Sequence, residues 1–309
     1  MNFLYCFDEN YNLQAYNSIN SFVINLKEKS NFFIIHKSPS TFEKYLKNLN
    51  LHTDHNFYVY KFDRKNYLFP GVDNTHVSEA TYYRLFIDEY LPEKLEKLIY
   101  VDCDVLCIDY SENEVEKIFL EIEKNNLVIG VRTEMVDNKD YIDNLMLKQE
   151  KYFNAGVMFI NYKKWTNLAK TNIFKENIFK LKDRILWWDQ DVLNHTFDGE
   201  YVELGLSFNY PIERNISFDN NFISKNVYFL HYQGKNKPWK IDSVGTKFSF
   251  IYTDYFRKLN IGKFHIVTTN PLLDFVKYIK LLFPGSRIID FKWELTKSYF
   301  KAVVNYLIK

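Results

Sequence analysis

The chain has 309 residues, of which 47 % are hydrophobic and 26 % are charged, and its formal net charge is +1. This composition excludes an intrinsically disordered chain, and the balanced charge argues against a nucleic-acid-binding protein. Three cysteines without a C-x-x-C pair favour a reducing compartment. We expect neither a signal peptide nor a transmembrane helix, because no run of about 18 apolar residues occurs.

Short apolar runs alternate with segments of helical periodicity along most of the chain. The expected strands are residues 2–7, 32–36, 57–62, 98–108, 127–131, 155–162, 201–205 and 227–231. The expected helices are residues 13–26, 40–49, 79–91, 112–124 and the run after WWDQ, with Ser40 and Glu43 in capping-box spacing and Ser78 as a further cap. This alternation predicts an α/β fold with a mostly parallel sheet.

The last part of the chain, residues 261–309, differs from the rest. It is helical and apolar, and basic residues are interleaved with the apolar ones: Lys277, Lys280, Arg287, Lys292, Lys297, Lys301 and Lys309. We interpret it as a basic amphipathic tail that contacts an anionic membrane surface, and a helical cap with a solvated basic face is the alternative. The expected organisation is one domain over residues 1–260, followed by this C-terminal helical tail.

The segment LIYVDCDVLCI, residues 98–108, resembles a buried strand that carries two carboxylates. Alternate side chains of a strand share a face, so Asp102 and Asp104 are expected side by side. Two ionised carboxylates repel each other in a poorly solvated site, and a hard cation such as Mn²⁺ or Mg²⁺ would neutralise them. A cation that also binds a diphosphate stabilises a departing phosphate, so the pair suggests a nucleotide-diphosphate site. An exposed turn is the alternative.

A second stretch, FLHYQGKNKPW, has residues that suit the same chemistry. His231 lies at the end of an expected strand and is followed by Gly234 and Lys237. A histidine can complete a metal site with two aspartates, a glycine lets the backbone approach a phosphate, and a lysine neutralises it. Asp8, Asp102, Asp104 and His231 all end apolar runs, and ligands of open α/β sheets bind beyond the carboxyl ends of strands. A structural role for His231 is the alternative.

Two more stretches have groups that suit a sugar. YFNAGVMFINYKKW presents Asn154, Ala155 and Gly156 just before an expected strand, where an amide and two small residues allow a polyhydroxyl ligand to approach. WWDQDVLNHTF presents Asp189, Gln190 and Asp191 before a helical run, and carboxylates and amides bind sugar hydroxyls. The alternatives are a tight turn in the first stretch and helix N-capping by Asp189 in the second.

Together these stretches resemble the bacterial retaining glycosyltransferases of family 8, the group that contains lipooligosaccharide galactosyltransferases and is related to glycogenin. The motifs FDENY, HVSEATYYRL, YVDCDVL, YFNAGVMFIN, WWDQDVLN and HYQGKNKPW follow the family's order and approximate spacing from residue 1 to about residue 240. The resemblance implies a GT-A type fold, which is a nucleotide-binding, Rossmann-like mixed sheet flanked by helices. One departure is VRTEMV, where many family members have an aspartate and this chain offers Glu134.

The resemblance also implies a role for each matching residue. Asp102, Asp104 and His231 would hold Mn²⁺ or Mg²⁺, and a UDP-sugar would be the donor substrate. The uracil and ribose would contact Asp8, Asn10 and Tyr11, and the diphosphate would contact His76, Gly234 and Lys237. The donor sugar would contact Arg84, Asn154, Ala155, Gly156, Asp189 and Gln190. The last two are the expected catalytic residues, with Gln190 on the far side of the anomeric carbon from the leaving group.

We therefore expect a metal-dependent retaining enzyme that moves galactose or glucose from a UDP-hexose to a saccharide or glycolipid acceptor of a bacterial surface glycan such as lipopolysaccharide. Because Gln190 is a poor nucleophile, front-face attack by the acceptor hydroxyl is favoured over a covalent glycosyl-enzyme. The expected location is the cytoplasm at the inner face of the membrane, without a nucleic-acid partner. The alternatives are a UDP-sugar hydrolase or nucleotidyltransferase, and a non-catalytic nucleotide-sugar-binding module.

Overall fold

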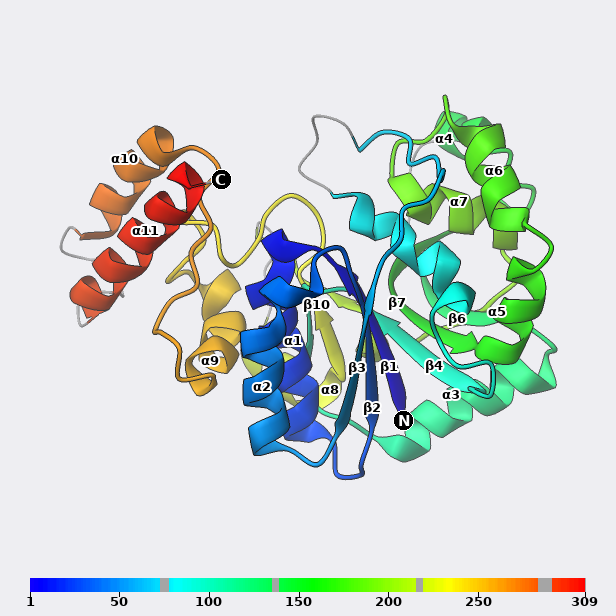
Figure 1. The fold of residues 1–309 in the computed structure, drawn as a ribbon, viewed down its shortest axis with the longest axis horizontal. Coiled ribbons are helices and arrows are strands. Elements are labelled where there is room, and N and C mark those ends of the chain that lie inside the picture. Colours follow the sequence, from blue (N-terminus) through cyan, green and yellow to red (C-terminus); the bar gives the residue numbers. More distant parts are fainter. Residues whose placement is uncertain (73–77, 135–138, 215–218, 283–290, 309) are drawn as a thin grey trace.

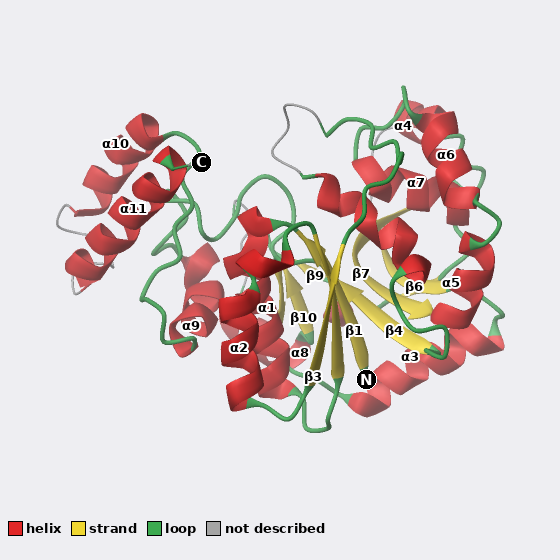
Figure 2. Ribbon diagram, in the orientation of Figure 1, coloured by secondary structure: helices red, strands yellow, loops and turns green. Residues whose placement is uncertain are grey.

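A computed structural model of the protein describes residues 1–72, 78–134, 139–214, 219–282 and 291–308. Its centre is a seven-stranded sheet in the order β3-β2-β1-β4-β7-β6-β8 (Figure 2). These strands are β1 (Asn2–Phe7), β2 (Asn31–His36), β3 (Asn56–Lys61), β4 (Lys97–Val101), β6 (Ile129–Glu134), β7 (Tyr152–Asn161) and β8 (Val202–Glu203). Strand β7 is antiparallel to both neighbours, whereas the remaining pairs are parallel. The predicted α/β fold with a mixed sheet is therefore confirmed.

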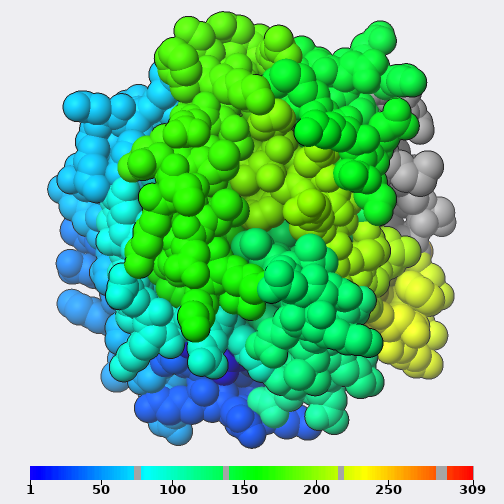
Figure 3. Space-filling model, turned by 90° about the vertical axis from the view of Figure 1, so that its right-hand side faces the viewer, coloured from blue at the N-terminus to red at the C-terminus, as the bar shows by residue number. Residues whose placement is uncertain are grey.

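Helices cover both faces of this sheet, as the alternation of side chains along the strands requires. On β1, Phe3 and Tyr5 pack with α1 (Asn12–Asn25), α2 (Glu43–His52), α3 (Glu112–Lys124) and α9 (Phe250–Lys258). Leu4 and Cys6 belong to the opposite cluster, with the 3-10 helix η3 (Glu79–Glu89), α5 (Tyr162–Ala169), α6 (Ile173–Leu181) and α7 (Trp188–Phe197). In Figure 3 the green segments of α5 and α6 cover the second face.

Several predicted elements differ in detail. Ser40 lies in the 3-10 turn η2 (Pro39–Thr41), and α2 begins at Glu43 without a side-chain cap, so the capping-box prediction was wrong. Ser78 does cap the next helix, accepting a hydrogen bond from Ala80 N, but that helix is a 3-10 helix and is kinked at Phe86, whose torsions are non-helical. The strand expected at 155–162 already begins at Tyr152, because it pairs with β6 through that residue.

A second, three-stranded sheet in the order β5-β10-β9 lies beside the first. Its strands are β5 (Val105–Cys107), β9 (Tyr210–Pro211) and β10 (Phe229–His231). The expected continuous strand over residues 98–108 was therefore wrong. The chain leaves β4 at Val101, turns with a hydrogen bond from Val105 N to Asp102 O (3.1 Å), and enters the other sheet. Both aspartates consequently lie at the junction of the two sheets, and pairing of Val105 with His231 brings the histidine there too.

The remaining elements are short: η1 (Glu9–Tyr11), α4 (Lys139–Asn144), η4 (Leu206–Phe208), α8 (Asn220–Asn226) and η5 (Lys247–Ser249). The C-terminal helices α10 (Pro271–Leu282) and α11 (Lys292–Leu307) lie side by side at the left of Figure 1, beyond α9. They form an apolar cluster of their own, in which the rings of Tyr278 and Tyr299 stack with centroids 4.4 Å apart. Because Ile241 and Val244 join this cluster, the helices also contact the main body. The domain division at residue 260 stays a prediction.

Candidate active site

A cavity of about 710 Å³ opens at the carboxyl ends of β1 and β4. Most residues predicted to bind the donor or the metal line it: Tyr11, Arg84, Asp102, Asp104, Asn154, Asp189, Gln190, His231, Gly234 and Lys237. Glu134 also lines the cavity, where it pairs with Arg132 (Nη2–Oε1 3.7 Å). His76 lies outside the described residues, so its predicted diphosphate contact stays a prediction.

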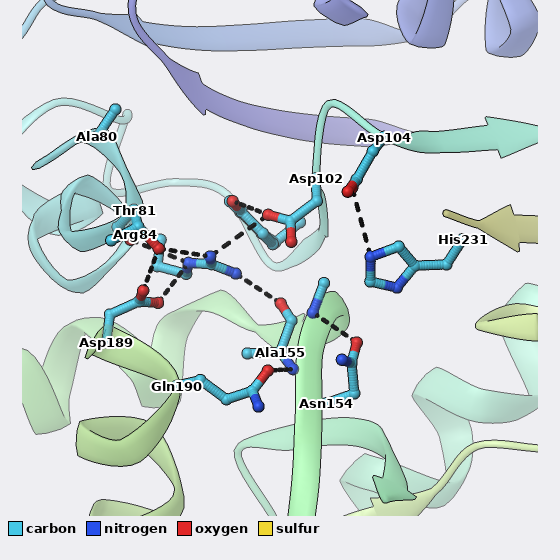
Figure 4. A network of polar contacts seen from close by, with 12 residues as sticks. Ala80, Thr81, Arg84, Asp102, Asp104, Asn154, Ala155, Asp189, Gln190 and His231 are labelled. Atoms are coloured by element: carbon cyan, nitrogen blue, oxygen red, sulfur yellow. Dashed lines mark hydrogen bonds and ion pairs between the residues drawn. The ribbon is translucent and has the colours of Figure 1, made fainter. Parts of the chain in front are cut away.

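The three predicted metal ligands meet at the junction of the two sheets. Asp102, Asp104 and His231 each offer one ligand atom, and these atoms all lie within 4.8 Å of one another. Nε2 of His231 lies 3.3 Å from Oδ1 of Asp104 (Figure 4). A carboxylate pair with an imidazole nitrogen is a suitable donor set for Mn²⁺ or Mg²⁺.

A chain of hydrogen bonds behind His231 assigns the protons of its ring. Gly156 N and Asn209 Nδ2 both donate to Asn154 Oδ1 (3.0 Å each), so Asn209 must direct its own oxygen to His231. That oxygen lies 2.9 Å from Nδ1 of His231 and therefore takes the Nδ1 proton. Nε2 of the neutral ring then offers its lone pair on the side of the Asp104 carboxylate, so a nitrogen ligand and carboxylate oxygens converge on one point. The residues present therefore fit a divalent cation.

Lys237 forms an ion pair with Asp104. Its ammonium group contacts Asp104 Oδ2 and donates to the carbonyl of Tyr232 at 2.8 Å. Burial raises the pKa of the Asp104 carboxyl, but the positive charge of Lys237 opposes burial and holds that pKa well below its usual range. The lysine predicted to contact a diphosphate thus already lies beside the metal ligand.

Arg84 connects the metal ligands with the predicted sugar site. Its buried guanidinium lies 3.3 Å from Oδ1 of Asp102 and 2.7 Å from Oδ2 of Asp189, and it donates to the carbonyl of Ala155 at 2.6 Å (Figure 4). Burial raises the pKa of Asp189 to about 6, against the opposing effect of Arg84. Asp189 does not cap α7, because the N-cap position is Trp187 and makes no side-chain cap. The capping alternative is therefore wrong, and Asp189 instead accepts from Thr81 and pairs with Arg84.

Asn154, Ala155 and Gly156 lie inside β7 rather than before a strand, which corrects their predicted position. Ala155 acts through its backbone: its amide donates to Gln190 Oε1 at 3.0 Å, and its carbonyl accepts from Arg84. At Gly156, a Cβ atom would lie 2.3 Å from Cε1 of His231. This glycine therefore admits the histidine, and nothing in these contacts requires it for a sugar.

The predicted nucleotide residues divide into two groups. Tyr11 lines the cavity, and its ring meets Trp239 edge-on with centroids 6.5 Å apart. Asp8 is buried and accepts hydrogen bonds from Asn10 N (2.9 Å) and Asn10 Nδ2 (3.2 Å), which holds the turn that presents Tyr11. Asp8 and Asn10 therefore have a local structural role in this structure, and their contact with uracil and ribose stays a prediction.

The order of these motifs along the chain agrees with one family. The family model for glycosyl transferase family 8 matches residues 2–243. The chain belongs to glycosyl transferase family 8. Among its family 8 relatives, a lipopolysaccharide 1,2-glucosyltransferase of Escherichia coli is 30 % identical over 198 residues, covering 58 % of this chain and 54 % of the relative. A lipopolysaccharide 1,3-galactosyltransferase of Salmonella typhimurium is 30 % identical over 171 residues, covering 52 % of this chain and 49 % of that protein.

The chain thus spans about half the length of these two family 8 relatives. The fold is also similar to that of the galactosyltransferase LgtC, solved in complex with donor and acceptor sugar analogues. That structure has a TM-score of 0.69 and 22 % sequence identity, and the match covers 89 % of this chain and all of the other. The likeness establishes the predicted fold, a GT-A-like mixed sheet flanked by helices.

Sequence reasoning missed several residues around the site. Asn209 sets the ring orientation of His231, Thr81 contacts Asp189, and Tyr152 contacts Gln190. Thr81 lies in HVSEATYYRL and Tyr152 begins YFNAGVMFIN, whereas Asn209 lies in none of the quoted motifs. Membership of these motifs was the available signal for Thr81 and Tyr152, although periodicity assigns an aromatic residue such as Tyr152 to the core.

Proposed function

We propose that the chain is a metal-dependent retaining hexosyltransferase that moves glucose or galactose from a UDP-sugar to a saccharide acceptor of a bacterial surface glycan. The observation that carries the proposal is the convergence of Asp102, Asp104 and His231, whose ligand atoms all lie within 4.8 Å of one another, beside a lysine that can neutralise a phosphate. Family membership and the names of the relatives, which act on lipopolysaccharide, support the same reaction.

Different residues of the chain contribute to breaking the bond between the donor sugar and the diphosphate. Asp102, Asp104 and His231 would hold Mn²⁺ or Mg²⁺, which supplies Lewis-acid stabilisation of the departing diphosphate. Lys237, which lies beside Asp104, would add a second positive charge near the same oxygens. Arg84 contacts both Asp102 and Asp189, so it keeps the metal ligands and the sugar site at a fixed separation.

Asp189 and Gln190 are proposed to face the donor sugar. Asp189 lines the cavity, where Arg84 and Thr81 hold its carboxylate in place. Gln190 offers a neutral amide to the positive charge that develops at the anomeric carbon. The acceptor oxygen then bonds to that carbon on the face from which the phosphate leaves, and the departing phosphate oxygen takes the acceptor's proton. This front-face route retains the anomeric configuration.

The test is UDP release from a panel of UDP-sugars, without acceptor, in the presence of Mn²⁺ or of a chelator. We expect slow release from UDP-glucose or UDP-galactose that the chelator abolishes, and transfer when saccharide acceptors are added. Release of UMP instead of UDP would identify a nucleotidyltransferase-like cleavage. Hydrolysis unaffected by any acceptor would identify a hydrolase. Tight UDP binding without turnover of any donor would favour the binding module and contradict the proposal.

We also propose that α10 and α11 place the enzyme on an anionic membrane surface, at the inner face of the cytoplasmic membrane. No helix in the described residues has the length and hydropathy needed to cross a bilayer. The support is a set of apolar side chains on the two helices that stay exposed, among them Leu272 (84 %), Leu273, Val276, Trp293 and Leu307. Lysines interleave with them, as in helices that lie in a lipid interface.

Vesicle flotation tests this surface. The wild-type chain should float with vesicles that contain anionic phosphatidylglycerol and should remain below neutral phosphatidylcholine vesicles. Replacing Lys297 and Lys301 by glutamate should abolish flotation, since each basic residue contributes about 1 kcal/mol near such a surface. The matched control is the same charge reversal at two other exposed lysines, Lys124 at the end of α3 and Lys182 directly after α6. Equal binding of both double variants would favour a simple helical cap.

A further inference from the structure

A buried carboxylate lies next to Gln190 on α7 without taking part in the proposed reaction. Asp191 is 0 % exposed. Its Oδ2 accepts from the backbone amides of Leu186 (2.7 Å) and Trp187 (2.8 Å). Its Oδ1 accepts from the hydroxyls of Tyr152, at 2.7 Å, and of Tyr141. Burial raises the pKa of both tyrosines, so both keep the protons that they donate to Asp191.

The carboxylate reaches Gln190 through Tyr152. The Gln190 amide makes two hydrogen bonds: Oε1 accepts from Ala155 N at 3.0 Å, and Nε2 donates to the Tyr152 hydroxyl at 3.0 Å. A backbone amide can only donate, so Ala155 requires an oxygen at Oε1 and places the NH₂ group at Tyr152. Since Tyr152 already donates its single proton to Asp191, its oxygen is available only as an acceptor. Each of these hydrogen bonds therefore has one allowed direction: Gln190 donates to Tyr152, and Tyr152 donates to Asp191.

We propose that Tyr152 is a positioning residue that holds the side-chain amide of Gln190 in one orientation, with Asp191 as its anchor. This inference rests on the proposed function, in which Gln190 faces the anomeric carbon. The buried negative charge of Asp191 polarises the Gln190–Tyr152 and Tyr152–Asp191 hydrogen bonds and increases the electron density on the Gln190 amide oxygen. An amide held and polarised in this way stabilises the positive charge that develops on the sugar, and it does so without reorganising during the reaction.

Tyr141 provides a matched control, because its hydroxyl bonds the same oxygen of Asp191. It lies 3.5 Å from the Tyr152 hydroxyl, at the outer limit of a hydrogen bond, whereas the two hydrogen bonds of the Gln190 amide described above go to Ala155 and Tyr152. Tyr152→Phe and Tyr141→Phe therefore each remove a hydroxyl from the Asp191 cluster, but only the first releases the Gln190 amide. A purely structural role for the cluster predicts equal effects of the two changes.

The experiment measures kcat and KM for metal-dependent UDP release by wild type, Tyr152→Phe, Tyr141→Phe, Gln190→Ala and the double variant Tyr152→Phe/Gln190→Ala. We expect Gln190→Ala to lower kcat about 10- to 100-fold. Tyr152→Phe should lower kcat about 10-fold and leave KM within about twofold, whereas Tyr141→Phe should change kcat by less than about threefold. The double variant should be no slower than Gln190→Ala alone, because Tyr152 acts only through that residue.

Three outcomes would overturn the inference while leaving the proposed function intact: normal kcat in Tyr152→Phe, equal losses in both tyrosine variants, or multiplicative losses in the double variant. Normal kcat in Gln190→Ala would remove the role of Gln190 and the inference with it. Absence of UDP release by the wild-type chain with every donor and acceptor would overturn the proposed function itself. Thermal unfolding of each variant in the absence of substrate identifies any change that acts through folding.

Discussion

Asp104→Asn is expected to lower metal-dependent turnover about 10³-fold or more, which corresponds to ~4 kcal/mol of transition-state stabilisation. The substitution keeps the size of the side chain but removes the charge that faces both Lys237 and Nε2 of His231. The new amide could also direct its NH₂ group at the Lys237 ammonium. Metal affinity should therefore fall together with the rate, because a carboxamide is a much weaker ligand for a hard cation.

The measurement for this variant pairs a Mn²⁺ titration with the rate of UDP release at saturating donor. Asp109→Asn is the matched control, since it makes the same change on an exposed side chain shortly after β5. It should leave both Mn²⁺ affinity and turnover near the wild-type values. Near-normal turnover of Asp104→Asn at low Mn²⁺ concentration would remove the metal from the proposed mechanism.

Gly156→Ala should weaken Mn²⁺ binding and lower turnover by about 10²-fold, because a misplacement of about 1 Å at a reacting site has effects of this size. The added Cβ would lie 2.3 Å from Cε1 and 2.9 Å from Nδ1 of His231, and 3.0 Å from Oδ2 of Asp102. Carbon atoms in contact prefer about 3.5–4.0 Å, so the imidazole or the strand must move. Either movement disturbs two metal ligands together.

Gly130→Ala is the control for this steric argument. Gly130 lies in the neighbouring strand β6, and its added Cβ would meet methyl groups of two isoleucines away from the metal site, Ile122 Cδ1 at 3.2 Å and Ile118 Cγ2 at 3.4 Å. Gly130→Ala should change the free energy of unfolding more than it changes Mn²⁺ affinity. The argument would be wrong if Gly156→Ala bound Mn²⁺ as tightly as Gly130→Ala and the wild-type chain. Both variants should be compared at the same fraction folded.

The aspartate pair shows how far the sequence could predict the site. Carboxylates at the ends of apolar runs identified Asp102 and Asp104 as ligands, but the expected strand register placed them side by side on one face. The chain instead changes sheets at Asp102, and the two side chains have different partners: Asp102 accepts from Tyr100 at 2.6 Å, whereas Asp104 pairs with Lys237 and His231. Local periodicity carries no information about which sheet the next residue joins.

The positioning groups were the least predictable part of the site. Asn209 acts on His231 across 22 residues of chain, and Tyr152 acts on Gln190 across 38. Asn209 lies between η4 and β9, where polar residues are common for reasons unrelated to function. Tyr152 fits an apolar strand equally well with or without a partner for its hydroxyl. Such roles depend on which polar atoms remain unpaired after folding, and only the packed structure decides that.

The amino-acid sequence by itself determined which side chains of a strand share a face of the sheet and which polar residues lie at the strand ends. Phe3 and Tyr5 belong to one core and Leu4 and Cys6 to the other because alternation along a strand is a local property of the backbone. Only the tertiary structure decided which way each proton points, from Gly156 through Asn154 and Asn209 to His231. Hydrogen-bond directions follow from contacts between distant segments, since a buried donor or acceptor must be satisfied by whatever the packing brings beside it.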